Sequence, residues 1–129
     1  MTYMAAAVGG FPETETDSAL EALKQRPVDL VHLARHTLGN RDLEREVLQI
    51  FTRQSVVYLD RIRRAKNGSE RLMAAHTIKG SARGIGAWEV ADLAEGLEGP
   101  AASAAQIAQL AAAVEKTNGF ITALLDDQP

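Results

Sequence analysis

The fold is decided by residues 41–66, which read RDLEREVLQIFTRQSVVYLDRIRRAK. Neither glycine nor proline interrupts this stretch, and its apolar residues recur at spacings suited to one buried stripe of a helix. The predicted stripe consists of Leu43, Val47, Ile50, Phe51, Val57, Tyr58 and Ile62. The pattern therefore predicts one long amphipathic helix, the longest in the chain.

Five other segments carry helix boundaries in their sequence. They span residues 17–25, 30–38, 70–83, 87–97 and a last stretch that ends near residue 125. Asp29 and Ser69 are expected to cap the second and third of these helices, and Ser103 begins a capping box for the last. Gly84 and Gly86 are expected to end the third helix, because glycine disfavours a helix interior.

The predicted helices define an all-α fold. No segment alternates apolar and polar residues with period two over a useful length, so no strand is predicted. The four later helices have short connections, which favours an antiparallel four-helix bundle with one or two short N-terminal helices covering one end. We expect residues 1–16 to be a flexible leader and residues 17–127 to form a single domain, most simply a monomer.

The composition excludes several classes of protein. A chain of 129 residues has room for one core, and 46% hydrophobic but only 5% aromatic residues suit a core of Ala, Leu, Ile and Val. A net charge of −3 argues against a nucleic-acid partner. There is no cysteine for a disulfide and no apolar run long enough to span a bilayer. Residues 1–11 lack the basic and full apolar regions of a signal peptide, so none is expected there. We expect a soluble cytoplasmic protein with no membrane association.

The predicted helix at residues 70–83 has two distinct faces. At about 100° per residue, one arc carries the apolar residues that are expected to face the bundle core. These are Ala75, Ile78, Ala82 and Ile85. A second arc, centred roughly 100° away, carries Leu72, His76, Lys79, Gly80 and Arg83. The wheel therefore places His76 at or near the solvent.

The residues around His76 suit phosphoryl chemistry. A neutral imidazole nitrogen is a good nucleophile near neutral pH, and nearby cations favour that neutral form. Lys79 and Arg83 can offset the charge of an attached phosphoryl group and of the transition state. Gly80 has no side chain, so the active site of a partner can approach closely.

A family resemblance is carried by residues 76–82, which read HTIKGSA, and by residues 85–87, which read IGA. They resemble the signature of histidine-containing phosphotransfer (HPt) domains, in which the phosphorylated histidine is followed by Lys-Gly-Ser and then by a Leu-Gly-Ala turn. Agreement extends to Leu97-Glu98, and the resemblance covers roughly residues 28–125.

The resemblance implies a phosphorelay protein without ATP-dependent kinase activity of its own. His76 would accept a phosphoryl group from an aspartyl phosphate on one receiver domain and donate it to an aspartate on another. The implied partners are response-regulator receiver domains and a hybrid sensor histidine kinase in a two-component system. No resident cofactor is implied, since the receiver supplies Mg²⁺. The alternative is a helical-bundle adaptor that binds a signalling partner through the same face without being phosphorylated.

Two pairs of residues near His76 have more than one interpretation. Leu72 and Met73 either form an apolar collar for a receiver helix or pack inward. The family pattern usually has small or polar residues where this chain has Arg83-Gly84. Arg83 is therefore a candidate phosphate or partner contact, and Gly84 could end the helix one turn early.

Two further groups have a functional and a structural interpretation. His32 and His36 stand four apart and could share a metal ion, but a solvated face is favoured because no third ligand is evident. A basic cluster near the end of the long helix could bind phosphate or an acidic partner, although a solvated helix end is favoured. It consists of Arg61, Arg63, Arg64 and Lys66. We predict no metal site.

Overall fold

The computed structural model describes residues 26–127, and the predicted leader and the predicted helix at residues 17–25 lie outside them. Within the described residues the chain forms five α-helices and no strand. They are α2 (Leu30–His36), α3 (Arg41–Arg64), α4 (Gly68–Ile85), α5 (Trp88–Gly96) and α6 (Ala104–Asp126). The all-α prediction is confirmed.

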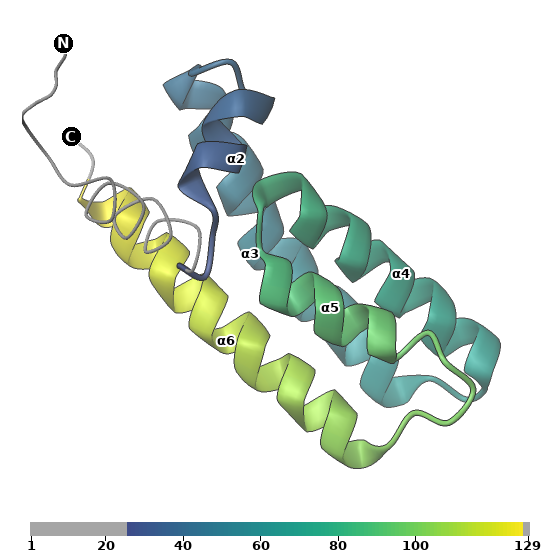
Figure 1. Ribbon diagram of the computed structural model, residues 1–129. Helices are drawn as coiled ribbons and strands as arrows, with labels where there is room; N and C mark the ends of the chain where they lie inside the picture. Colours follow the sequence, from purple (N-terminus) through teal and green to yellow (C-terminus); the bar gives the residue numbers. More distant parts are fainter. Residues whose placement is uncertain (1–25, 128–129) are drawn as a thin grey trace, which may run out of the picture.

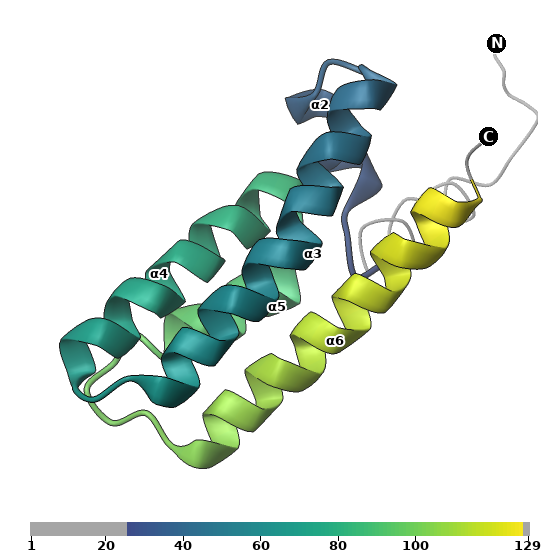
Figure 2. The ribbon, with the colours of Figure 1, turned by 180° about the vertical axis from the view of Figure 1, so that it is seen from behind.

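Four of the helices pack as an antiparallel bundle (Figure 1). One side of the bundle is formed by α3, which contacts α4 and α6, and the other by α5, which contacts the same two helices. Figure 2 shows α2 at the end of the bundle where α3 begins, and α2 contacts α4. The predicted four-helix bundle with a short N-terminal helix at one end is therefore confirmed.

The buried face of α3 is rotated relative to the predicted stripe. Phe51 and Ile62 are buried as predicted, together with Leu48, Ser55 and Leu59. Three residues of the predicted stripe are instead 40–44% exposed, namely Leu43, Ile50 and Val57. The reason is that α3 packs against both α4 and α6, so its buried face is centred between these two contacts. Val47 and Tyr58 are partly buried against the core, so the predicted stripe was wrong only at these three exposed residues.

Helix α4 begins before the predicted position. Its N-cap is Asn67, whose side chain accepts a hydrogen bond from the backbone N–H of Glu70 at 2.9 Å. Ser69, which was expected to cap the helix, lies in its first turn. The predictions for Asp29 and for the Ser103 capping box are confirmed.

Helix α4 also ends later than predicted, because Gly84 lies inside it and Gly86 ends it. Gly86 has a φ of 79°, a left-handed conformation that favours glycine. A Cβ atom on Gly86 would lie 2.8 Å from Cβ of Asp29, so any side chain at this position would also clash with Asp29. The backbone N–H of Asp29 donates to the Gly86 carbonyl at 2.9 Å, which joins the start of α2 to the end of α4.

Candidate functional site

The two predicted faces of α4 are confirmed. Ala75, Ile78 and Ala82 are at most 2% exposed and Ile85 is 5% exposed, so they form the core face. The side chain of His76, on the other face, is 67% exposed. Helix α4 therefore anchors its apolar side in the bundle and presents His76 to solvent.

The ring of His76 is oriented by Glu98, which lies in the connection between α5 and α6. Nδ1 of His76 is 3.2 Å from Oε1 of Glu98. Because a carboxylate only accepts hydrogen bonds, Nδ1 must carry the proton of the neutral ring and donate it. The lone pair then lies on Nε2. In this arrangement Nε2 is the ring nitrogen whose lone pair is left available.

Glu98 is also paired with Lys79. Nζ of Lys79 lies 2.6 Å from Oε2 of Glu98, and the two side chains are only 12% and 19% exposed. The hydrogen bond from Lys79 is the largest cause that holds the pKa of Glu98 below its usual value; burial opposes it, and the bond from His76 adds to it. Glu98 is therefore a carboxylate at neutral pH and keeps Nδ1 protonated.

The charges beside His76 alternate along the side of α4 that faces α5. Glu95 lies 3.9 Å from Nζ of Lys79 and 3.5 Å from a terminal nitrogen of Arg83. Lys79 shares Glu98 with His76, and each of the two cations is paired with a carboxylate. The positive charge expected next to the ring is therefore offset by the carboxylates of Glu95 and Glu98.

Glu98 is the residue that sequence reasoning missed. The family resemblance includes it, but the sequence alone assigns it no role. Its contact with His76 joins residues 22 positions apart and depends on how α5 packs on α4. A local sequence pattern does not predict such a contact. The motif match at Leu97-Glu98 was the one signal that could have identified it.

An exposed surface surrounds the ring on its other sides. Leu72 is 43% exposed and Met73 is 68% exposed, so inward packing is wrong, and the collar for a receiver helix stays a prediction. A Cβ atom on Gly80 would contact nothing within 4 Å. The approach to His76 is therefore open over Gly80 and bordered by apolar side chains.

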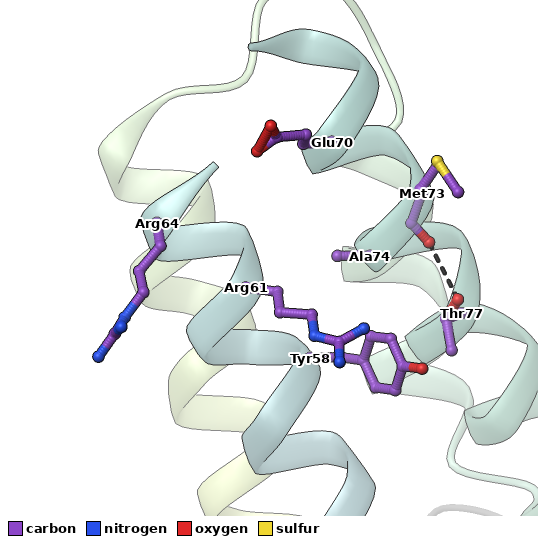
Figure 3. Close-up of a pocket in the computed structure, with 7 residues that line it drawn as sticks. All are labelled: Tyr58, Arg61, Arg64, Glu70, Met73, Ala74 and Thr77. Carbon is purple, nitrogen blue, oxygen red and sulfur yellow. Dashed lines mark hydrogen bonds between the residues drawn. The ribbon is translucent and has the colours of Figure 1, made fainter. Parts of the chain in front are cut away.

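A groove of about 400 Å³ lies between α3 and α4, next to this surface (Figure 3). Its lining consists of Tyr58, Arg61, Arg64, Glu70, Met73, Ala74 and Thr77. The guanidinium of Arg61 lies over the ring of Tyr58, 4.7 Å from its centroid, whereas Arg64 points away and pairs with Asp60 at 3.0 Å. The basic cluster is exposed, as expected for a solvated helix end, and Arg61 and Arg64 also line the groove.

The two histidines of α2 have a structural role. Nε2 of His32 lies 2.9 Å from the carbonyl oxygen of Arg83, so the ring binds the end of α4. The same ring packs 4.2 Å from His36 and 4.8 Å from Trp88, between centroids. A solvated face was thus the wrong interpretation for His32. Among the described residues, no group of three or more His, Cys, Asp or Glu side chains is placed to hold a metal ion.

Together, the bundle and its exposed histidine define a class of protein: a small helical domain that presents one oriented imidazole on a long helix. A family model agrees, since that of the Hpt domain matches residues 46–126. The chain belongs to the Hpt domain family. Comparison with curated proteins and with solved structures gave no match.

Membership defines the general role. Hpt domains are histidine phosphotransfer modules of phosphorelays, which work with receiver domains and histidine kinases and have no kinase activity of their own. Within residues 26–127, no helix has the length and apolarity required to cross a membrane.

Proposed function

We propose that this chain relays phosphoryl groups through His76 between the aspartates of two receiver domains in a cytoplasmic phosphorelay. One receiver would belong to a hybrid sensor histidine kinase and the other to a response regulator. The observation that carries the proposal is the 3.2 Å hydrogen bond between Nδ1 of His76 and Glu98. This hydrogen bond leaves the lone pair on Nε2, and the side chain of His76 is 67% exposed.

The transfer step follows from this tautomer. The Nε2 lone pair attacks the phosphorus of an aspartyl phosphate, and the N–P bond forms as the P–O bond to the aspartate breaks. The bonding electron pair leaves with the aspartate carboxylate. Nδ1 keeps its proton, so the phosphorylated ring carries a positive charge that the Glu98 carboxylate offsets. Transfer to the second receiver is the same step in reverse.

The two proteins divide the chemistry between them. Phosphoryl transfer requires positioning and charge stabilisation more than covalent participation. In this proposal the receiver supplies Mg²⁺ and the reacting aspartate, while this chain supplies an oriented imidazole and needs no ATP. It has no resident cofactor.

The surface around His76 suits a receiver domain. Leu72 and Met73 offer apolar contacts, and Gly80 leaves room above the helix for the receiver's active site. The groove between α3 and α4 adds the cation of Arg61, which complements the carboxylates that surround a receiver's phosphorylated aspartate. A monomer presents this surface in full.

The proposal is tested by labelling with a phosphorylated receiver. The His76→Gln variant should take up no acid-labile phosphate and keep its helical content, whereas the matched His36→Gln variant should be labelled like the unmodified protein. Labelling of His76→Gln would refute the proposal. Receiver binding that survives in His76→Gln, with no labelling of the unmodified protein, would instead support the adaptor.

A further inference from the structure

Arg83 lies on the same face of α4 as His76, two turns nearer the C-terminus. Seven residues at about 1.5 Å and 100° each separate the two Cα atoms by about 10 Å along the axis and only about 20° around it. Side chains on a helix lean toward its N-terminus. Arg83 therefore leans toward His76.

Gly80 separates the two side chains on this face. It follows His76 by four residues and precedes Arg83 by three. A Cβ atom on Gly80 would contact nothing within 4 Å, so no neighbouring side chain covers this part of the helix. An anion attached to Nε2 of His76 can extend over Gly80 toward the guanidinium.

Arg83 is more easily displaced from its partner than Lys79 is. Lys79 is 12% exposed and lies 2.6 Å from Glu98. Arg83 is 51% exposed, and its contact with Glu95, itself 57% exposed, is 3.5 Å long. Exposed pairs of this kind contribute little free energy. A phosphoryl group carries nearly two negative charges and accepts paired hydrogen bonds from arginine, so it competes well with Glu95.

We propose that Arg83 leaves Glu95 when His76 is phosphorylated and binds the phosphoryl oxygens over Gly80. This inference rests on the proposed function and adds a phosphoryl-binding residue to it. Arg83 then stabilises the phosphorylated protein relative to the unmodified one. The equilibrium of phosphoryl exchange with a receiver shifts toward this chain, and the Glu95 carboxylate is released to solvent.

The test is the equilibrium constant for exchange between a phosphorylated receiver and this protein, measured at concentrations where the proteins are mostly unbound. This constant depends only on the free forms of each protein, whereas docking contacts change the rate alone. Arg83→Gln should lower it by about fivefold to tenfold, the effect of one charge-assisted hydrogen bond. Glu95→Gln should raise it by about twofold, because it frees Arg83.

The control is Arg63→Gln, which removes an exposed arginine on the side of α3 that faces α6 and should leave the constant unchanged. Arg83→Lys, which keeps the charge, should fall between Arg83→Gln and the unmodified protein. An unchanged equilibrium constant in Arg83→Gln overturns the inference. If transfer is slower while that constant is unchanged, Arg83 is a receiver contact rather than a phosphoryl-binding residue. Failure of the proposed function would look different, because the unmodified protein would then take up no phosphate.

Discussion

The two flanks of the His76 surface differ in chemistry. The α5 flank consists of Lys79, Arg83, Glu95 and Glu98, and its charges are paired with one another at 2.6–3.9 Å. The α3 flank consists of Tyr58, Arg61, Met73 and Thr77, which line an open groove. Contacts with the imidazole come from the α5 flank through Glu98. The α3 flank offers apolar and basic side chains to whatever approaches.

This difference separates the tasks of the site. In the proposed relay, the α5 flank sets the tautomer of His76 and holds the charges that meet the phosphoryl group. The α3 flank is suited to recognition, since it combines an exposed methionine with a cation stacked on a ring. Changes in the α5 flank should therefore alter the transfer step, and changes in the α3 flank should alter receiver affinity.

The largest effect is expected at the border between the flanks, in Gly80→Leu. The new side chain would stand over the approach to His76 and should slow transfer from a receiver by about 100-fold, a loss of ~3 kcal/mol. The fold should be retained and stabilised by up to ~1 kcal/mol, since leucine favours helices over glycine. Quenched transfer assays and thermal unfolding measure the two effects.

The matched control for Gly80→Leu is Gly119→Leu, at another open glycine inside a helix, α6. It should stabilise the protein similarly and leave transfer unchanged. Wild-type transfer rates in Gly80→Leu would show that a receiver does not need to approach closely over this glycine. Gly80 would then have no role at the border between the two flanks.

A smaller effect is expected from Glu98→Ala, within the α5 flank. His76 would lose the acceptor that keeps Nδ1 protonated, and the transfer step at saturating receiver should slow by about 10-fold to 100-fold. Glu98→Gln keeps a hydrogen-bond acceptor and should lose less. Single-turnover kinetics measure the step. Glu95→Ala removes a carboxylate that does not touch the ring and frees Arg83, so it should not slow the step. A loss equal to that of Glu98→Ala would mean that overall charge, rather than the tautomer, matters.

The division between the flanks shows what could be predicted from the sequence. Helical periodicity is local, so it placed His76 on the exposed face and Ala75 and Ile78 in the core. Local chemistry also predicted the caps at Asp29 and Ser103. Gly84 was predicted wrongly because a glycine inside a helix costs only about 1 kcal/mol, which packing of Ala82 and Ile85 in the core can offset.

Contacts between distant segments were not predictable in this way. The bond from His76 to Glu98 and the bond from His32 to the Arg83 carbonyl join residues 22 and 51 positions apart. Both depend on how whole helices pack. Three residues of the predicted stripe of α3 were misplaced for the same reason, because the position of the stripe depends on where α4 and α6 lie.

A moderate effect on receiver affinity is expected from changes in the α3 flank. Met73→Ala and Arg61→Gln should each weaken receiver binding by about fivefold, through lost apolar contact and lost charge complementarity. The transfer rate at saturating receiver should not change. Titration of the receiver in transfer assays separates the two quantities. Arg63→Gln is the control, and a loss of maximal rate rather than affinity in Met73→Ala would contradict the separation of tasks.

The smallest effect concerns the dependence of stability on pH. The hydrogen bond from Lys79, against the opposing effect of burial, lowers the pKa of Glu98 from its ordinary 4.5 in the folded protein. A carboxyl group whose pKa is lowered by folding stabilises the protein above the unfolded pKa, and this contribution is lost as pH falls through the folded pKa. At neutral pH, Glu98→Gln should therefore be less stable than the unmodified protein by about 1 kcal/mol or less.

That difference should shrink as pH falls below 4.5, because both proteins then lack the Glu98 charge. Urea unfolding at neutral and acidic pH measures it. The Asp60→Asn variant is a suitable control, since it breaks only the exposed pair with Arg64 on the outer side of α3. A difference between Glu98→Gln and the unmodified protein that stays constant down to acidic pH would mean that the ionic pairing of the α5 flank does not stabilise the fold.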